Sequence, residues 1–165
     1  MSTAAAPTNR LAMTVLTTPD MANFAGNVHG GTLLKLLDQV AYACASRYAA
    51  SYVVTVSLDY VTFREPVHVG ELVNFLASVN HTGSSSMEVG IKVLAENIRS
   101  QQSRHVVSCF FTMVALDDAR RPVTVPPFVP TTPDEKRRHA DAALRKQLRK
   151  EGLERFEALK TKPEA

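Results

Sequence analysis

The chain contains 165 residues, of which 45% are hydrophobic and 21% are charged. A chain of this length and composition is expected to form one globular domain with its own hydrophobic core, and not a disordered segment. Residues 1–133 carry nine basic and nine acidic side chains, so the formal net charge of +3 comes entirely from residues 134–165. A neutral body argues against nucleic acid or an anionic membrane as the main partner.

Targeting signals and cysteines bear on the compartment. No uncharged apolar stretch reaches the roughly 18–20 residues of a membrane span, and residues 1–7 resemble neither a signal peptide nor a transit peptide. Cys44 and Cys109 lie among apolar neighbours, at a spacing that fits no zinc or redox motif. We therefore expect reduced, buried thiols, no membrane span and a cytoplasmic location.

The first elements are predicted from the spacing of apolar residues. Alternation of apolar and polar residues indicates a strand over 11–17, after a flexible segment 1–10. A loop follows that contains three of the seven glycines, and then a helical apolar repeat from 32 to about 48. Apolar residues lie almost all the way around this helix, so we expect it to be buried on most of its surface.

Four long strands are predicted next, over 53–63, 72–80, 87–96 and 106–116. They are joined by short turns and exceed the usual strand length of about 5–6 residues, which predicts one long, curved antiparallel sheet around the helix. The fold class is therefore α+β, with a main domain over 11–120.

The C-terminal part is predicted to lie outside that domain. Five of the nine prolines fall within 122–133, which predicts a Pro-rich linker over 121–132. The sequence Thr132-Pro133-Asp134-Glu135 forms a capping box, so a helix should start there. We expect a charged helix and tail over 133–165, with the helix ending near Gly152.

Two glycines at the entrance of the first helix carry a possible chemical role. Gly30 and Gly31 leave backbone N–H groups accessible at the positive end of the helix dipole, where an oxyanion would be stabilised. Such a pair can equally serve only to allow a tight turn. Asn27, just before them, can adopt an unusual backbone conformation or can position a water or a carbonyl oxygen.

Asp38 lies two turns into the apolar helix. Burial of a carboxylate is costly unless it is paired, so an ion pair with Lys35 or Arg47 is one explanation and exposure on a narrow polar strip is another. The functional hypothesis is a poorly solvated carboxylate that is basic enough to activate water. His29 can be a helix cap or an alternative base.

Other chemistry has little support. None of the remaining histidines has a second histidine three or four residues away, so no metal site is expected. The sequence contains no Gly-x-Ser-x-Gly nucleophile elbow and no nucleotide-binding glycine fingerprint.

Residues 22–38 resemble the signature of the hotdog-fold acyl-CoA thioester hydrolases, the cytosolic acyl-CoA hydrolase family, in its single-domain bacterial type. The stretch reads Ala22-Asn23-Phe24-Ala25-Gly26-Asn27-Val28-His29-Gly30-Gly31-Thr32-Leu33-Leu34-Lys35-Leu36-Leu37-Asp38. Three further stretches match, at 54–59, 63–71 and 86–89, and the linker and tail are similar over 125–137. In total the resemblance covers about residues 11–150.

This resemblance implies a central helix wrapped by a curved antiparallel sheet. It also implies homodimers, often assembled as trimers of dimers, whose active sites are shared between subunits. Asp38 matches the family's helix acid and Asn27 its loop asparagine, contributed by opposite subunits. Some relatives have an aromatic residue where this chain has His29, which argues against His29 as the base.

The implied reaction is hydrolysis of acyl-CoA to a free acid and coenzyme A, with no cofactor because coenzyme A is part of the substrate. The N–H of Gly31, helped by Gly30, would polarise the thioester carbonyl. Asp38 would activate water or attack directly, and Asn27 would position the water or the carbonyl.

The phosphates of coenzyme A require a binding site. The turn Gly83-Ser84-Ser85-Ser86 offers amide and hydroxyl donors, although an ordinary hairpin turn would look the same. Arg64, Arg99 and Arg104 are further candidates that the sequence does not rank.

Three alternatives remain at this point. A non-catalytic acyl-CoA-binding or sensing module on the same fold would be favoured by a missing helix acid, but Asp38 is present. A nucleic-acid-binding tail is disfavoured by its interspersed acids and few aromatic residues. A hotdog dehydratase usually relies on a histidine paired with an acid in a different arrangement.

Overall fold

The computed structural model describes residues 7–160. One compact unit ends at Phe128, and a second begins at Val129. The expected flexible segment 1–10 lies mostly outside the described residues, although Arg10 already starts the first strand. Within residues 7–160, none of the helices combines the length and the hydrophobicity of a membrane-spanning segment.

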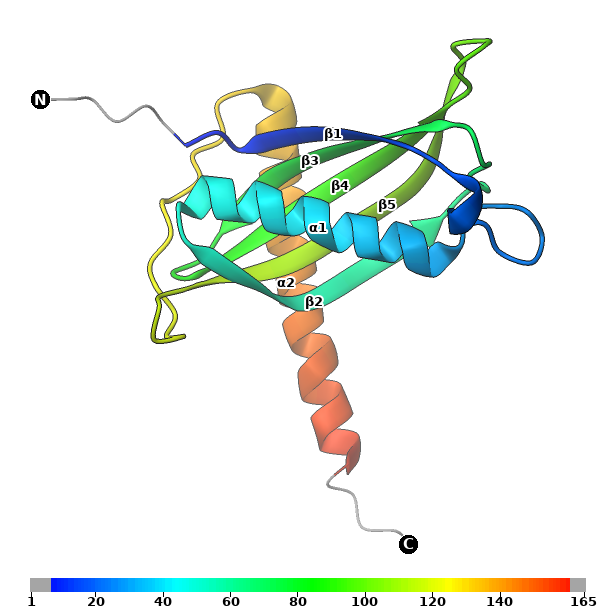
Figure 1. Cartoon of the computed structure of the whole chain (residues 1–165). Coiled ribbons are helices and arrows are strands. Elements are labelled where there is room, and N and C mark those ends of the chain that lie inside the picture. Colours follow the sequence, from blue (N-terminus) through cyan, green and yellow to red (C-terminus); the bar gives the residue numbers. More distant parts are fainter. Residues whose placement is uncertain (1–6, 161–165) are drawn as a thin grey trace, which may run out of the picture. The chain divides into compact units, whose positions relative to one another are not determined.

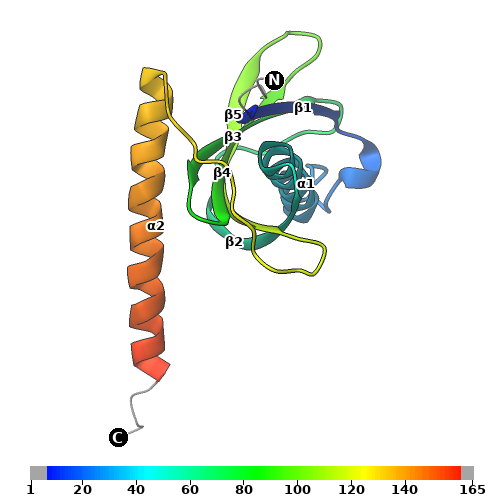
Figure 2. The ribbon, with the colours of Figure 1, turned by 90° about the vertical axis from the view of Figure 1, so that its left-hand side faces the viewer.

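A five-stranded antiparallel sheet forms the first unit (Figure 1). Its strands are β1 (Arg10–Leu16), β2 (Tyr52–Phe63), β3 (Leu72–Thr82), β4 (Ser86–Glu96) and β5 (Ser103–Leu116). The order across the sheet is β1-β3-β4-β5-β2, so β1 and β2 are the outer strands. Two register shifts interrupt the pairing of β2 with β5, and such bulges bend a strand. The sheet accordingly curls around the helix α1 (Gly30–Ala49) (Figure 2).

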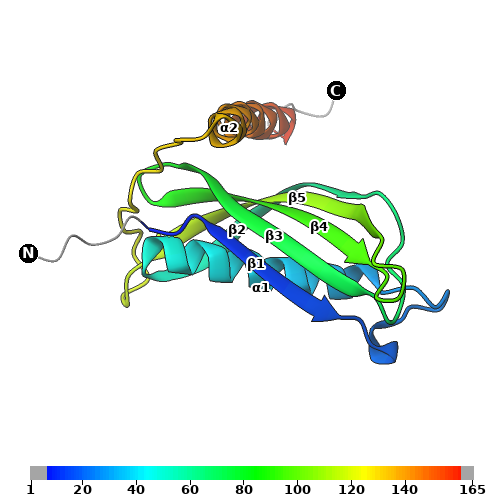
Figure 3. The same ribbon diagram turned by 90° about the horizontal axis from the view of Figure 1, so that it is seen from above.

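Helix α1 packs against the concave face of the sheet, as the view from above also shows (Figure 3). The buried face of α1 carries Leu33, Leu37, Val40, Ala41, Cys44, Ala45 and Tyr48. These side chains share one core with Phe75, Met87, Phe111 and Met113 of the strands. The opposite face carries Lys35, Asp38, Gln39 and Tyr42 and is exposed. The expectation that α1 is buried on most of its surface is met, because the curved sheet leaves only six of its twenty residues exposed.

The predicted elements agree closely with the observed ones, and the α+β hotdog fold is confirmed. Among the strands the largest difference is at β5, which begins at Ser103 because polar residues 103–105 continue the ladder with β4. Cys44 and Cys109 are free and buried. Burial raises the pKa of Cys44 to about 11 and that of Cys109 to about 12, so neither thiol is an effective nucleophile.

Part of the proline-rich stretch is attached to the first unit. The N–H of Val123 donates to the carbonyl of Ala115, and that of Val125 donates to the carbonyl of Ser84. The N–H of Phe128 donates to Thr82 Oγ1 at 2.9 Å. Prolines exclude regular structure here, but residues 122–128 still follow a fixed path across the end of β5 and the turn between β3 and β4.

In its described residues, 129–160, the second unit contains one helix, α2 (Pro133–Lys160). The predicted capping box is present, because Glu135 N–H donates to Thr132 Oγ1 and Thr132 N–H donates to Glu135 Oε2. The predicted end near Gly152 is wrong, because the helix continues to Lys160. Ion pairs within the helix, such as that of Arg137 with Asp134, engage several of its basic side chains, as expected for a solvated charged helix.

Candidate active site

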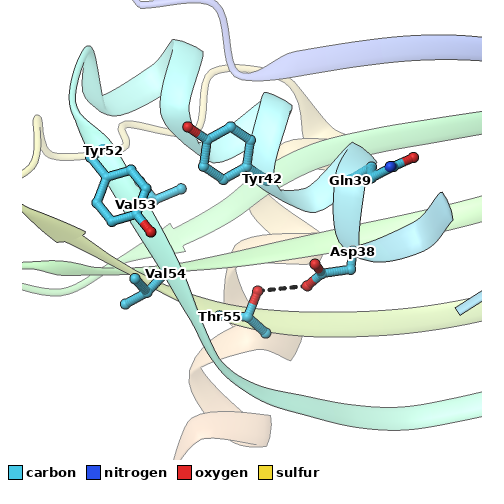
Figure 4. Close-up of a pocket in the computed structure, with 7 residues that line it drawn as sticks. All are labelled: Asp38, Gln39, Tyr42, Tyr52, Val53, Val54 and Thr55. Carbon is cyan, nitrogen blue, oxygen red and sulfur yellow. Dashed lines mark hydrogen bonds between the residues drawn. The ribbon is translucent and has the colours of Figure 1, made fainter. Parts of the chain in front are cut away.

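Asp38 lies at the rim of an open pocket between α1 and β2 (Figure 4). The pocket has a volume of about 320 Å³ and is lined by Asp38, Gln39, Tyr42, Tyr52, Val53, Val54 and Thr55. Thr55 Oγ1 donates a hydrogen bond to Asp38 Oδ1 at 2.7 Å. Thr55 sits directly before the first bulge of β2, where the strand bends beside the helix.

The surroundings of Asp38 exclude one of the structural explanations for it. Within the described part of the chain, Asp38 forms no ion pair, so the possible pairs with Lys35 and Arg47 are absent. Its only hydrogen bond there comes from Thr55, which leaves the second carboxylate oxygen uncommitted. Asp38 is exposed in the single chain, so the expectation of a poorly solvated carboxylate is not met by one protomer alone.

His29 is the N-cap of α1. Its Nδ1 accepts a hydrogen bond from the N–H of Gly31 at 2.9 Å, which satisfies one of the free amides at the helix start. Among residues 7–160 the N–H of Gly30 has no partner. The structure therefore offers Gly30 as the accessible amide, whereas Gly31, the first choice from the sequence, is occupied.

The loop before α1 is held by its two asparagines. Asn23 Oδ1 accepts hydrogen bonds from the N–H groups of Ala25 and Asn27, at 2.9 and 3.2 Å. Gly26, with φ of +79°, provides the left-handed backbone that this turn requires. Asn27 Oδ1 lies 2.9 Å from His68 Nδ1, so that ring nitrogen donates to it. No acceptor for the side-chain NH₂ of either asparagine lies within residues 7–160, so both groups can donate to another molecule.

A second pocket, of about 360 Å³, lies at the entrance of α1. It is lined by Asn23, Asn27, Val28, Gly30, Leu33, Phe63, Arg64, Glu65, Pro66 and Val67. Arg64 is exposed, and its guanidinium forms no ion pair with the other described residues. Arg104, by contrast, is engaged by Glu71, Glu65 and the carbonyl of Pro66, so it is not available to a phosphate.

One protomer does not bring all the predicted site residues together. Asn27, Gly30 and Arg64 surround the entrance of α1, whereas the turn 83–86 lies toward its C-terminal end (Figure 1). That turn is closed by a hydrogen bond from the N–H of Gly83 to the carbonyl of Ser86. Asp38 lies between these regions in a separate pocket. No group of three or more potential metal ligands occurs among residues 7–160.

Comparisons with known proteins agree with this architecture. The family described as the Thioesterase superfamily matches residues 25–101. The protein VdlD of Helicobacter pylori is 48% identical over 143 residues, which cover 87% of this chain and 82% of VdlD. A hexameric acyl-CoA thioesterase solved without ligand is 36% identical, with a TM-score of 0.85, and the match covers 87% of this chain and 92% of that one. The chain belongs to the hotdog acyl-CoA thioesterases.

A further solved thioesterase bears on the site residues. The acyl-CoA hydrolase of Staphylococcus aureus, solved with butyryl-CoA and CoA, is 30% identical with a TM-score of 0.83, and the match covers 92% of each chain. Variants of that protein replace an asparagine, an aspartate fifteen residues later and a threonine seventeen residues after that. Counted from Asp38 of this thioesterase, the same spacings fall on Asn23 and Thr55.

Neither Asn23 nor Thr55 was a predicted site residue. Thr55 lies within a run of β-branched strand residues, where a threonine is ordinary, and its contact with Asp38 exists only because β2 lies beside α1. Asn23 belongs to the stretch that resembles the family signature. Its place in that stretch is the only signal in the sequence, because the spacing of fifteen residues from Asp38 gains meaning only beside the S. aureus variants.

Proposed function

We propose that this thioesterase hydrolyses acyl-CoA to a free acid and coenzyme A. In this reaction Asp38 either activates the attacking water or itself attacks the thioester carbonyl. The observation that carries this proposal is the 2.7 Å hydrogen bond from Thr55 to Asp38 in an open pocket. One oxygen of the carboxylate is held by this bond, and the other is free to accept a proton from water or to attack the carbonyl carbon. The leaving thiolate needs no strong general acid, because a thiol has a pKa of about 8.5.

The groups at the helix entrance would stabilise the developing oxyanion. The N–H of Gly30 is accessible and lies at the positive end of the α1 dipole, where negative charge is favoured. The N–H of Gly31 would join it only after release from His29. We therefore assign the principal donor to Gly30 and a secondary role to Gly31.

An asparagine of the same loop would supply the other polar contact. Asn27 is the residue that the resemblance implies, but its side-chain oxygen is bound to His68. The fifteen-residue spacing from the variants of the S. aureus hydrolase favours Asn23. The proposed roles are thus orientation of the water or carbonyl by Asn23 and attachment of the loop to His68 by Asn27.

A homodimer would complete the site. Strand β2 is the last strand of the sheet, and Val56 and Tyr60 on it are 61% and 60% exposed, which is typical of an edge that pairs with another chain. Antiparallel pairing of two such strands would place the Phe63 end of one beside the Tyr52 end of the other. The helix entrance of one subunit would then face the Asp38 pocket of its partner.

The hexameric neighbour supports further assembly of such dimers into a trimer of dimers. The same strand pairing would bring Arg64 of one subunit to the side on which the turn 83–86 of the other lies. Arg64 and the turn Gly83-Ser84-Ser85-Ser86 are therefore the proposed ligands of the coenzyme A phosphates. The two free thiols fit a reducing compartment, and we place the enzyme in the cytoplasm.

The test is a thiol-release assay with substrates from acetyl-CoA to palmitoyl-CoA. Asp38→Asn should lower kcat by about 10²–10⁴-fold, because it removes the base and keeps the shape of the side chain. Asp141→Asn, at an exposed carboxylate of α2, is the matched control and should keep full activity. Wild-type activity in Asp38→Asn would exclude the catalytic role. Absence of thiol release by the wild type would favour the non-catalytic binding module.

A further inference from the structure

The proposed mechanism leaves one wall of the Asp38 pocket without a role. Tyr42 of α1 and Tyr52, the first residue of β2, close the pocket on the side away from the helix entrance (Figure 4). Their ring centroids are 6.2 Å apart, and their planes are inclined by 62°, an edge-to-face pair.

This aromatic wall is not part of the core. Tyr42 is 42% exposed and Tyr52 is 53% exposed, although both are large aromatic side chains. Among residues 7–160 neither hydroxyl has a hydrogen-bond partner, so no polar contact explains where the rings lie. With Val54 they form the apolar end of the pocket, whereas Asp38, Gln39 and Thr55 form its polar end.

The polarity of the pocket matches the two parts of an acyl thioester. The carbonyl must lie beside Asp38 and Thr55, and an alkyl chain gains free energy only where it leaves water for apolar surface. The pantetheine arm contains amide groups that require hydrogen bonds, which the two rings and Val54 do not supply. The acyl chain is therefore the part of the substrate that suits the aromatic wall.

The distance from Asp38 to the aromatic wall limits the length of the acyl chain. Tyr42 follows Asp38 by four residues, so both lie on the same face of α1, about 6 Å apart along the helix axis. An acyl chain that starts at the carbonyl carbon would cover this distance with roughly four or five carbon–carbon bonds. We infer that Tyr42 and Tyr52 form the end of the acyl pocket and restrict the enzyme to short chains of roughly six carbons or fewer.

This inference rests on the proposed function and is tested by the chain-length profile of kcat/KM. Wild type should be most active on short acyl-CoA and decline beyond hexanoyl-CoA. Tyr42→Ala and Tyr52→Ala should raise the activity on octanoyl-CoA relative to butyryl-CoA by tenfold or more, because each methylene that gains apolar contact contributes about fourfold. Tyr42→Trp should shift the profile toward shorter chains.

Two controls separate the wall from general effects of substitution. Tyr42→Phe keeps the ring and should keep the wild-type profile. Phe156→Ala removes an exposed aromatic residue from α2 and should also leave the profile unchanged. The change should appear in the ratio between substrates, whereas a merely destabilised protein would lose activity on all of them equally.

Several outcomes would overturn the inference. A wild type most active on palmitoyl-CoA would exclude a wall at this distance. Equal changes in KM for all chain lengths in the alanine variants would place the tyrosines beside the pantetheine arm. Hydrolysis with an unchanged profile in all variants would refute the inference and leave the proposed function intact, whereas no hydrolysis by wild type would refute both.

Discussion

Two carboxylates of the same unit, Asp38 and Glu71, have opposite environments. Glu71 is only 5% exposed and accepts two hydrogen bonds from Arg104, at 2.6 and 2.9 Å, and one from the N–H of His68 at 2.8 Å. Asp38 is exposed and accepts one hydrogen bond, from Thr55. A carboxylate whose oxygens are all engaged holds structure together, and one with a free oxygen can take part in a reaction.

The Glu71 cluster fixes the segment that leads from β2 to β3. Arg104 of β5 also donates to the carbonyl of Pro66 at 2.6 Å and lies 3.3 Å from Glu65. Thr17 donates to the carbonyl of His68. Arg64 belongs to this segment, and so does His68, whose ring binds Asn27. The Glu71 cluster therefore also holds in place the side chains around the entrance of α1.

The largest expected effect on folding comes from Glu71→Ala. It leaves Arg104 partly buried without its main partner, and loss of one member of a buried pair costs about 3–5 kcal/mol of unfolding free energy. Denaturant unfolding measures this change. Glu65→Ala removes the exposed partner of the same arginine and should cost less than about 1 kcal/mol. Equal losses of unfolding free energy in the two variants would contradict the assignment of Glu71 as the main partner of Arg104.

Substitution of Thr55 tests the other carboxylate. Thr55→Val removes the hydrogen bond to Asp38 and preserves the side-chain volume, so kcat should fall by roughly 10–100-fold, the value of a hydrogen bond to a charged group. Thr55→Ser should retain most of the activity. The midpoint of thermal unfolding should change little, because both side chains are exposed. A stability loss as large as that of Glu71→Ala would mean that the Asp38 region is also structural.

Acid titration separates the two regions further. Burial acts to raise the pKa of Glu71, but the hydrogen bonds from Arg104 and from the His68 N–H outweigh it and lower the pKa below its usual value. Because the pKa in the folded protein is the lower one, the stabilisation exists above the unfolded pKa of about 4.3 and is lost as the pH falls through the folded value. Wild type should therefore lose stability below about pH 4. Glu71→Gln should remove this component, and an unchanged slope would contradict the assignment.

A smaller effect is expected at the entrance of α1. His29→Ala removes the N-cap and should lower the unfolding free energy by about 1 kcal/mol, whereas His29→Asn restores a capping oxygen. The substitution also releases the N–H of Gly31, so kcat should be maintained or increased. A loss of kcat as large as that of Asp38→Asn would instead make His29 a catalytic residue.

Local patterns in the sequence predicted most of the fold. Strands and helices follow from periodicity that is present within each segment, and the capping box at Thr132 marks the start of α2 to the residue. The prediction that α2 ends near Gly152 was wrong, because a glycine permits a helix to end but does not require it. Asp38 was predicted because an acid within an apolar helix is unusual.

What could not be predicted depends on contacts between distant segments. The partner of Asp38 is seventeen residues away on a strand, and the amide of Gly31 is occupied because the ring of His29 turns back onto it. Asp38 is exposed in one chain, and the dimer proposed above would reduce its contact with water. A pattern within one segment carries none of this information.

The outer position of β2 has a consequence for genetics and mixing experiments. Suppose that β2 joins two subunits and that each site combines residues from both. Sites made only of Asp38→Asn chains then lack the acid, and sites made only of Asn23→Ala chains lack the asparagine, so both homodimers are inactive. Co-expression of the two chains should yield hybrid dimers in which one site carries both lesions and the other carries neither. Activity would then reappear from two inactive parents, and dilution of the enzyme would abolish it as the subunits separate.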